Sequence, residues 1–263
     1  MYAFKLTRPA DVSAAAIKAA AGGRLLAGGQ TLLPALKLRL TSANEIVDLG
    51  AVASLAGIRR EGNSIVIGAM TRHAEVASSA EVKAAIPGLA DLAGHIGDRQ
   101  VRNMGTIGGS IANNDPAACY PSAVLALGAT VVTDQRQIPA DQFFTGMFST
   151  ALKEGEVITA VSFPIPKRAA YAKFVQPASR FALLGVFVAQ TDAGARVAVT
   201  GGKTCVYRHT GMEAALSTSF TAAAAKTVKV DATDLNTDLH GSAAYRAQLI
   251  SVQTQRAVTK ALV

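Results

Sequence analysis

Ala27-Gly28-Gly29-Gln30-Thr31 and Thr106-Ile107-Gly108-Gly109-Ser110 share one pattern, a Gly-Gly pair flanked by polar residues. Each stretch follows a strand-like apolar run and precedes apolar, helix-like sequence. Glycine tolerates positive φ and lets another molecule approach the main chain, so such a pair can direct several backbone N–H groups at one phosphate. Either stretch alone could be a tight turn. Two of them predict the two halves of one anion site.

The sequence around the first stretch alternates between strand and helix patterns, which indicates a small α/β unit. It predicts strands over Tyr2–Leu6, Arg24–Ala27 and Glu45–Leu49, and helices over Pro9–Ala21 and Leu32–Leu40. From about residue 55 we expect a second subdomain, which opens with a hairpin of Leu55–Arg60 and Ser64–Gly68 around Glu61-Gly62-Asn63.

The second stretch lies in Gly97–Asp115, which has little periodicity and is expected to be a long functional loop. The patterns around it predict helices over Thr71–Ala77, capped by Thr71, and over Glu81–Ile96 and Pro121–Leu127, then strands over Ala129–Thr133, Val157–Phe163 and Tyr171–Phe174. From about residue 177 a separate α+β domain is expected. It comprises a hairpin, Ala182–Gln190 and Arg196–Thr200, and helices over Gly211–Leu216, Thr221–Val228 and Ala243–Leu262.

The composition is typical of a soluble globular protein with a substantial core. The chain has 263 residues, of which 50% are hydrophobic and 17% charged, enough for one large domain or two smaller ones. Apolar runs such as Phe181–Ala189 end well before the roughly 18 residues of a membrane span. The first six residues have no signal-peptide character, so we expect a cytoplasmic protein without a membrane span.

Charge and cysteine content exclude several other classes. The net charge is +8, but the 26 Lys and Arg are scattered and the chain has no Trp and only 5 Tyr to stack on bases, which disfavours nucleic acid. An acidic protein partner or an anionic cofactor fits this basic balance better. Cys119 and Cys205 are far apart and lack the spacing of metal ligands, so we expect two buried or half-buried thiols and no metal site.

Common catalytic and nucleotide-binding motifs are absent. The sequence has no Gly-x-Gly-x-x-Gly after a strand, no Walker A motif, no His-Glu-x-x-His and no Gly-x-Ser-x-Gly. Its four histidines are isolated and are interpreted as surface or helix-end residues: His73, His95, His209 and His240. No residue of this chain is predicted to be catalytic.

Three motifs together resemble a known family. They are Leu25-Leu-Ala-Gly-Gly-Gln-Thr-Leu-Leu-Pro-Ala-Leu-Lys-Leu-Arg39, Arg102-Asn-Met-Gly-Thr-Ile-Gly-Gly-Ser-Ile-Ala-Asn-Asn-Asp-Pro116 and Ala178-Ser-Arg-Phe-Ala-Leu-Leu-Gly185. They resemble the FAD-binding medium subunit of the molybdenum hydroxylases, which include aerobic carbon monoxide dehydrogenase and relatives of xanthine dehydrogenase. The resemblance covers nearly the whole chain, including Ala243-Ala-Tyr-Arg-Ala-Gln-Leu-Ile250.

The resemblance implies an α+β fold. It comprises an FAD-binding, PCMH-type domain over residues 1–176, with subdomains of about 1–54 and 55–176. A C-terminal domain of the carbon monoxide dehydrogenase flavoprotein type follows over residues 177–263. FAD would lie extended between the subdomains.

The resemblance also assigns residues to the cofactor. The first stretch would wrap the pyrophosphate and ribityl region with backbone N–H groups: Leu25, Leu26, Ala27, Gly28, Gly29, Gln30, Thr31 and Leu32. The second would close on it: Thr106, Ile107, Gly108, Gly109 and Ser110. Ile158 corresponds to a contact at the adenine end and Lys173 to a lysine near the flavin, although Lys173 could instead be a strand lysine that faces solvent.

Two positions depart from the family pattern. Cys119 stands where an Asp is often found, which puts an acceptor role toward ribose or adenine in question, with Asp115 as a candidate substitute. Phe181 stands where some members carry a Tyr beside the flavin ring, so an aromatic face is kept without the hydroxyl. Phe181 could also be an ordinary core residue.

The function implied by the resemblance is electron transfer without substrate chemistry in this chain. Electrons would come from 2Fe-2S clusters in a small partner subunit, reduced in turn by a large molybdenum-pterin subunit, and would leave FAD for NAD, quinone or oxygen. The expected assembly is a dimer of heterotrimers, and the large subunit would set the substrate. The alternatives are a stand-alone flavin oxidoreductase of the same fold class and a non-enzymatic basic binding module whose glycine loops are only turns.

Overall fold

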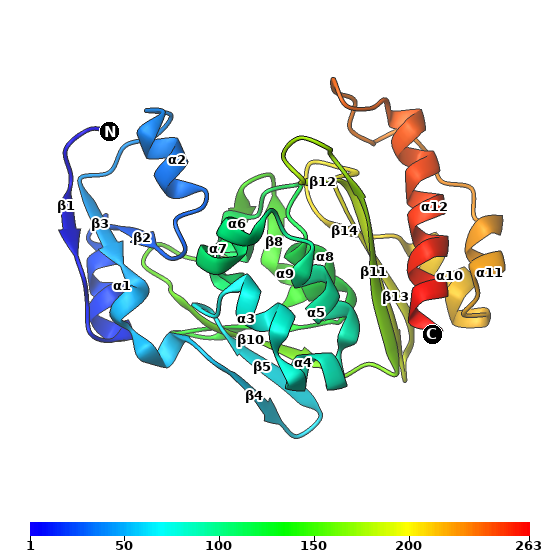
Figure 1. Ribbon diagram of the computed structural model, residues 1–263, viewed down its shortest axis with the longest axis horizontal. Helices are drawn as coiled ribbons and strands as arrows, with labels where there is room; N and C mark the ends of the chain where they lie inside the picture. The colour runs from blue at the N-terminus through cyan, green and yellow to red at the C-terminus, as the bar shows by residue number, and fades with distance from the viewer.

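The computed structural model describes every residue from 1 to 263, and the chain folds into three units that lie in a row (Figure 1). Each unit is built on its own sheet, of three, five and four strands from the N-terminus to the C-terminus. They are called the N-terminal, middle and C-terminal units below.

The N-terminal unit is a small parallel sheet with two helices. Its elements are β1 (Lys5–Thr7), α1 (Val12–Ala20), β2 (Arg24–Leu26), α2 (Leu32–Lys37), β3 (Glu45–Asp48) and the 3₁₀ helices η1 (Leu49–Ala51) and η2 (Ala53–Leu55). The strand order is β1-β3-β2. Parallel strands need crossover connections, and α1 and α2 supply them. The predicted small α/β unit is confirmed.

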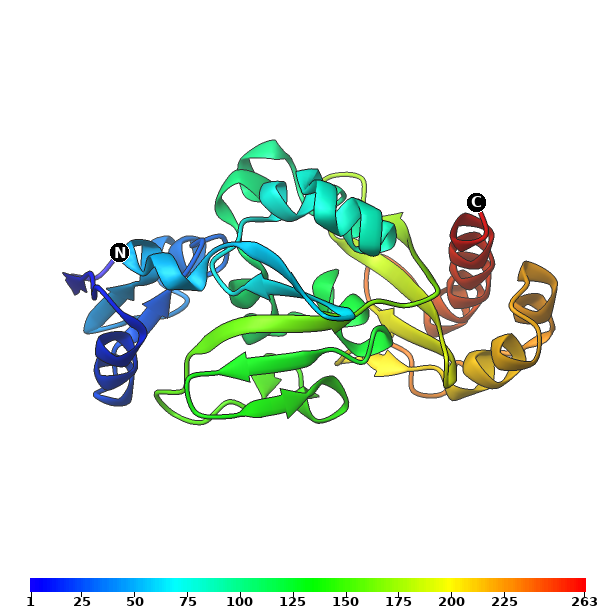
Figure 2. The ribbon, with the colours of Figure 1, turned by 90° about the horizontal axis from the view of Figure 1, so that it is seen from below.

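The middle unit is an antiparallel sheet with strand order β4-β5-β10-β6-β7, and β8 and β9 form a separate hairpin (Figure 2). Its strands are β4 (Ile58–Glu61), β5 (Ser64–Gly68), β6 (Thr130–Thr133), β7 (Gln137–Pro139), β8 (Phe144–Gly146), β9 (Ser149–Thr150) and β10 (Ile158–Pro164). Its helices are α3 (His73–Ser78), α4 (Ala80–Ala85), α5 (Pro87–Gly94), α6 (Arg99–Met104), α7 (Ile107–Asn113), α8 (Tyr120–Ala126) and α9 (Ala140–Phe143).

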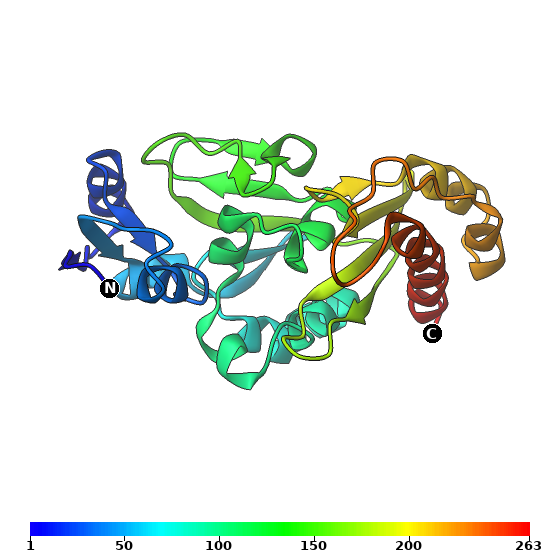
Figure 3. The same cartoon turned by 90° about the horizontal axis from the view of Figure 1, so that it is seen from above.

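The C-terminal unit is a four-stranded antiparallel sheet covered on its outer face by helices (Figures 1 and 3). Its elements are β11 (Arg168–Val175), β12 (Ala182–Thr191), β13 (Gly194–Thr200), β14 (Tyr207–Arg208), α10 (Thr210–Thr218), α11 (Ala222–Thr227) and α12 (Ala243–Ala261). No helix of the protein is long and apolar enough to cross a bilayer.

Strand β12 is buried on both faces, which explains its unbroken apolar sequence. Leu184, Val186 and Val188 belong to the core shared with α10, α11 and α12. Phe187 and Ala189 point the other way and join the core of the middle unit. The sheet therefore attaches the C-terminal helices firmly to the body of the protein.

The expectation that Gly97–Asp115 is one long loop is wrong, because this segment contains α6 and α7. Both helices are capped by a side chain: Asp98 accepts from the amide of Val101 at 2.8 Å, and Thr106 accepts from the amide of Gly109 at 3.2 Å. Helices of six and seven residues are too short to show a clear apolar period, so the pattern missed them.

Two helix boundaries also differ from the prediction. The segment Glu81–Ile96 is not one helix, because Pro87 begins a second one and Ile86 lies between α4 and α5. Thr71 does not cap α3, whose N-cap is Arg72. The Thr71 hydroxyl instead bonds both the amide and the carbonyl oxygen of Gly57, at 3.0 Å each.

Strand β11 extends the predicted strand Tyr171–Phe174 at both ends and pairs with β12. It therefore shares a sheet with the C-terminal unit, although a boundary at residue 177 would assign it to the first domain. The domain division stays a prediction, for which sheet membership favours a boundary near residue 167. The hairpin of β12 and β13 and the helices α10, α11 and α12 are found where the sequence predicted them.

Candidate functional site

A cavity of about 910 Å³ lies where the three units approach one another. Its walls include the β2–α2 loop, the α6–α7 region, the start of β10, and the end of β11 with the loop that follows. Half of its lining residues are hydrophobic. Ligand sites commonly have about 300–1,000 Å³ and mostly apolar walls with a few polar groups, so this cavity suits a large organic cofactor.

Of the eighteen predicted site residues, sixteen line this cavity. They are Leu25, Ala27, Gly28, Gly29, Gln30, Thr31, Leu32, Thr106, Gly108, Gly109, Ser110, Asp115, Cys119, Ile158, Lys173 and Phe181. Leu26 and Ile107 do not line it. Ile107 is fully buried in the core of the middle unit, and strand alternation turns Leu26 away from the side of Leu25. Contact of the other sixteen with FAD stays a prediction.

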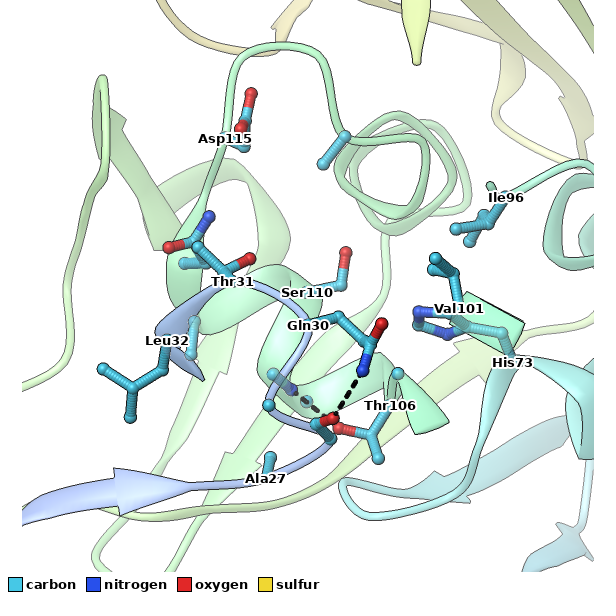
Figure 4. Close-up of a pocket in the computed structure, with 18 of the residues that line it drawn as sticks. Ala27, Gln30, Thr31, Leu32, His73, Ile96, Val101, Thr106, Ser110 and Asp115 are labelled. Carbon is cyan, nitrogen blue, oxygen red and sulfur yellow. Dashed lines mark hydrogen bonds between the residues drawn. The ribbon is translucent and has the colours of Figure 1, made fainter. Parts of the chain in front are cut away.

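The first glycine loop offers a row of free main-chain donors. None of the five amides from Gly28 to Leu32 donates to an acceptor within the protein. The side-chain amide of Gln30 folds back onto the carbonyl oxygen of Gly28 at 3.2 Å (Figure 4). Gly29 has a φ of +71°, a value that L side chains rarely adopt. The prediction of several unpaired donors therefore holds for this loop.

The second glycine loop differs, because four of its five amides, those of residues 107–110, are already bonded. Ile107 donates to the carbonyl oxygen of Thr71 at 3.1 Å, and Gly108 to that of Ala69 at 2.8 Å. Gly109 and Ser110 donate to the hydroxyl and the carbonyl oxygen of Thr106. For these four amides the expectation that they face an anion is wrong. Those of Ile107 and Gly108 fix α7 to the middle unit, and those of Gly109 and Ser110 close the first turn of α7.

What the second loop leaves available is a hydroxyl. The Ser110 side chain lines the cavity and makes no hydrogen bond within the protein (Figure 4). The two loops also touch, because a Cβ atom on Gly109 would lie 3.3 Å from the Cβ of Ala27. Ser110 is thus placed on the same wall as the free amides of the first loop.

Three cations and two carboxylates line the cavity: Arg24, Lys173, Arg180, Asp115 and Glu156. Glu156 is neutralised by Arg136, whose Nε and Nη2 donate to it at 2.9 and 3.0 Å. This guanidinium lowers the pKa of Glu156 to about 2. Asp115 uses one oxygen to accept from the amide of Ala117 at 2.8 Å. The balance of charge facing the cavity is therefore positive, as an anionic ligand requires.

The residues that depart from the family pattern also lie at this cavity. Cys119 is buried in its wall and Cys205 is half-buried, so the expected state of both thiols is confirmed. Phe181 lies half-buried between the cavity and the C-terminal core, 5.6 Å from the ring of His240 in an edge-to-face contact. Lys173 Nζ donates to the carbonyl oxygen of His95 at 2.9 Å.

His73 is one of the lining residues that the sequence interpretation did not assign to the site. It begins α3, so it is a helix-end residue as expected, but it is buried, lines the cavity, and lies 5.3 Å from the ring of Tyr120. Burial, aided by the charge of Arg102, lowers the pKa of His73 to about 4. A lone histidine carries no sequence signal for this, because its burial depends on α3 packing against α5 and α6.

Comparison with known proteins defines the class of this protein. Residues 2–166 match the family described as "FAD binding domain in molybdopterin dehydrogenase". The chain is 35% identical to the carbon monoxide dehydrogenase medium chain of Hydrogenophaga pseudoflava, over 90% of this chain and 88% of that protein. It is 36% identical to the 6-hydroxypseudooxynicotine dehydrogenase complex subunit alpha of Paenarthrobacter nicotinovorans, over 91% of this chain and 86% of that protein.

A solved structure agrees over the whole length. A chain of a carbon monoxide dehydrogenase from Hydrogenophaga pseudoflava superposes with a TM-score of 0.88 at 33% identity, and 99% of this chain and 98% of that chain are covered. The fold is thus that of an FAD-binding flavoprotein, a subunit of an oxidoreductase. The chain belongs to the family of FAD-binding medium subunits of molybdenum hydroxylases. The predicted resemblance, the α+β fold class and the cofactor are confirmed.

Proposed function

We propose that this chain is the electron-transfer subunit of a heterotrimeric molybdenum hydroxylase. In the proposed complex a large subunit with a molybdenum-pterin cofactor oxidises the substrate, and 2Fe-2S clusters of a small subunit carry the electrons to this chain. FAD supplies a centre that exchanges electrons singly or in pairs and so can reduce an acceptor such as NAD, quinone or oxygen. Two heterotrimers would associate into the complete complex.

The observation that carries the cofactor site is the row of free amides from Gly28 to Leu32 at the wall of the cavity. A diphosphate of charge about −2 accepts such donors well, and each charge-assisted hydrogen bond contributes about 1.5–3 kcal/mol. The Ser110 hydroxyl adds a donor from the middle unit. We assign the FAD pyrophosphate to this wall.

The remaining parts of the cavity are assigned by their chemistry. Lys173, near the end of β11, and Phe181, just before β12, offer a cation and an aromatic face at the cavity, and we assign them to the flavin. Ile158, at the start of β10, is assigned to the adenine end. Asp115 and Cys119 line the cavity as candidates for the ribose or adenine.

A role as one subunit among several fits the chain better than a stand-alone flavin reductase. The protein has no group of three or more His, Cys, Asp and Glu side chains that could hold a metal ion. The relatives that it matches over about nine tenths of its length are named as a medium chain and as a complex subunit. We therefore assign substrate oxidation to a partner chain.

The cofactor assignment is tested by adding FAD to the flavin-free full chain and comparing it with Ser110→Ala. Because this hydroxyl has no partner in the protein, its removal should leave the unfolding midpoint unchanged and weaken FAD binding roughly three- to tenfold. Ser78→Ala on the exposed face of α3 is the matched control. Failure of the wild-type chain to take up FAD would overturn the assignment.

The subunit assignment is tested by isolating the chain from cells that express it at its natural level. We expect it to co-purify with a cysteine-rich chain that holds 2Fe-2S clusters and with a larger molybdenum-pterin chain. Addition of the oxidisable substrate to that complex should bleach the flavin band. Substrate turnover by the isolated flavin-loaded chain would contradict the proposal.

A further inference from the structure

His73 presents an unsatisfied imidazole to the proposed FAD site. The residue is 4% exposed, its side chain makes no hydrogen bond, and its Nδ1 is fully enclosed without a partner. Figure 4 shows the ring pointing into the cavity between Gln30 and Val101. The other ring nitrogen, Nε2, is not enclosed in this way and also has no partner in the protein. Because buried polar side chains are nearly always paired, Nε2 is the atom that can take a partner from a ligand in the cavity.

The position of the ring is fixed by its surroundings. The amide of His73 donates to the carbonyl oxygen of Gly105 at 2.9 Å. Its Nε2 lies against the main chain of Gly105, where an added Cβ atom would be only 2.5 Å away. On the other side the ring meets that of Tyr120. These contacts leave the imidazole little freedom to turn away from the cavity.

The surroundings also select the tautomer. The Arg102 guanidinium nearby donates to the carbonyl oxygens of Ile96 and Gly97 at 3.0 Å each, and its charge opposes a second proton on His73. A neutral imidazole has one N–H and one lone pair. An enclosed N–H without an acceptor costs more than an enclosed lone pair, so the lone pair belongs on Nδ1. The N–H is then on Nε2.

The walls beside His73 indicate which part of FAD it meets. Ile96 and Val101 provide apolar surface next to the ring, and all three residues line the cavity (Figure 4). The diphosphate would be drawn to the free amides of Gly28–Leu32 instead, because a neutral imidazole adds no positive charge. Apolar walls with one neutral donor suit a planar ring that carries acceptor atoms at its edge.

We propose that His73 donates a hydrogen bond from Nε2–H to an acceptor atom on the edge of the flavin ring of FAD. The proposal rests on the assignment of this cavity to FAD. It makes His73 a cofactor-binding residue that orients the flavin, beyond the glycine loops that hold the pyrophosphate. No proton is transferred, because the imidazole stays neutral and acts only as a donor.

Two substitutions separate this role from simple packing. His73→Phe keeps a ring of similar size without a donor, and His73→Gln keeps a neutral N–H donor. We expect His73→Phe to weaken FAD binding about tenfold and to shift the visible absorption bands of the bound flavin, as for one lost hydrogen bond. His73→Gln should bind FAD within about threefold of the wild type, with the original band positions. Wild-type affinity and spectrum in His73→Phe would overturn the proposal.

A measurement on the wild-type full chain avoids any folding defect of the variants. With ¹⁵N-labelled histidine, the spectrum should show Nε2 protonated and Nδ1 unprotonated for His73, and the Nε2–H resonance should move when FAD is added. A proton on Nδ1, or resonances unmoved by bound FAD, would refute the inference while leaving the cofactor assignment intact. A chain that takes up no FAD would instead refute the cofactor assignment.

Discussion

Gly28 lies directly against the carbonyl oxygen of Met104, with no space between them for a Cβ atom. This contact joins the β2–α2 loop of the N-terminal unit to the end of α6 in the middle unit. Gly28 is therefore required for the approach of two parts of the chain to each other. The wall that carries the five free amides depends on that approach.

Replacement of Gly28 by Ala tests this dependence. The new methyl group would also meet the main chain of Gly105 at 2.6 Å, so α6 and the loop must separate. We expect a loss of about 2–3 kcal/mol in the free energy of unfolding, measured by urea denaturation, together with loss of bound FAD. Gly94→Ala is the control, since an added Cβ there meets only Ala77 at 3.9 Å. Equal stability of Gly28→Ala and wild type would show that the N-terminal and middle units can separate at this contact without cost.

The cavity could be predicted from the sequence, but the distribution of donors within it could not. The two glycine loops look alike as patterns, and both line the cavity. Only the fold shows that the amide of Gly108 is bonded to Ala69, from a turn some forty residues earlier, whereas that of Gly29 has no partner. The sequence does not distinguish a glycine that makes room for a ligand from a glycine that makes room for another segment of the same chain.

The same limit explains the other differences. The regular elements with long apolar periods, such as α12, were predictable, because periodicity is a local property. The helices α6 and α7 depend on the caps Asp98 and Thr106 and on packing against distant residues. The burial of His73 depends on helices that meet it from elsewhere in the chain. Neither the formation of α6 and α7 nor the burial of His73 can be deduced from a short segment of the sequence.

Glu156 is a buried carboxylate that stabilises the end of β6. Its side chain is fully buried and accepts from Arg136, from the hydroxyl of Thr133 at 2.8 Å and from the amide of Lys153 at 2.7 Å. We expect Glu156→Gln to lose about 2–4 kcal/mol of unfolding free energy, measured by urea denaturation. The exposed pair Arg59–Glu61 provides the control, because Arg59→Ala should change stability by less than about 0.5 kcal/mol. If Glu156→Gln loses less unfolding free energy than Arg59→Ala, Glu156 does not stabilise the end of β6.

His73 makes the stability of the flavin-free protein depend on pH. The pKa of His73 is lowered from 6.5 to about 4 in the folded protein, so between these values the unfolded chain binds a proton that the folded protein does not. Stability therefore falls as pH falls from about 6.5 to about 4, and no further below that. Between pH 7.5 and 5.0, the titration of His73 should lower the free energy of unfolding by about 2 kcal/mol.

The pH dependence is measured by urea denaturation of the flavin-free wild type and of His73→Phe at both pH values. Other titrating groups contribute equally to the two proteins, so the difference isolates His73. We expect the variant to lose about 2 kcal/mol less than the wild type between pH 7.5 and 5.0. If the wild type and His73→Phe lose the same unfolding free energy between pH 7.5 and 5.0, His73 is protonated in the folded state.

Arg246 connects α12 to the sheet of the C-terminal unit. It is almost fully buried and donates to the carbonyl oxygens of Leu183 and Gly201 and to Asp238, at 2.6–2.7 Å. Arg246→Met should cost about 3–5 kcal/mol in unfolding free energy, because three acceptors lose their donor. The exposed Arg256→Met on the same helix should be close to neutral. The affinity of the remaining folded protein for FAD should not change, since Arg246 does not line the cavity.

Substitution of Lys173 tests whether this residue is a cation beside the flavin or a strand lysine that faces solvent. Its ammonium group is held by the carbonyl oxygen of His95 and lines the cavity, so it should favour the negative charge that FAD gains on reduction. We expect Lys173→Gln to make the FAD reduction potential more negative by roughly 30 mV, or about 1.4 kcal/mol for two electrons. Lys167→Gln is the control, because Lys167 pairs with exposed Asp192 on the surface. If dye-equilibration titrations give the same potential for Lys173→Gln and the wild type, the lysine is a solvent-facing residue, and the flavin lies elsewhere in the cavity.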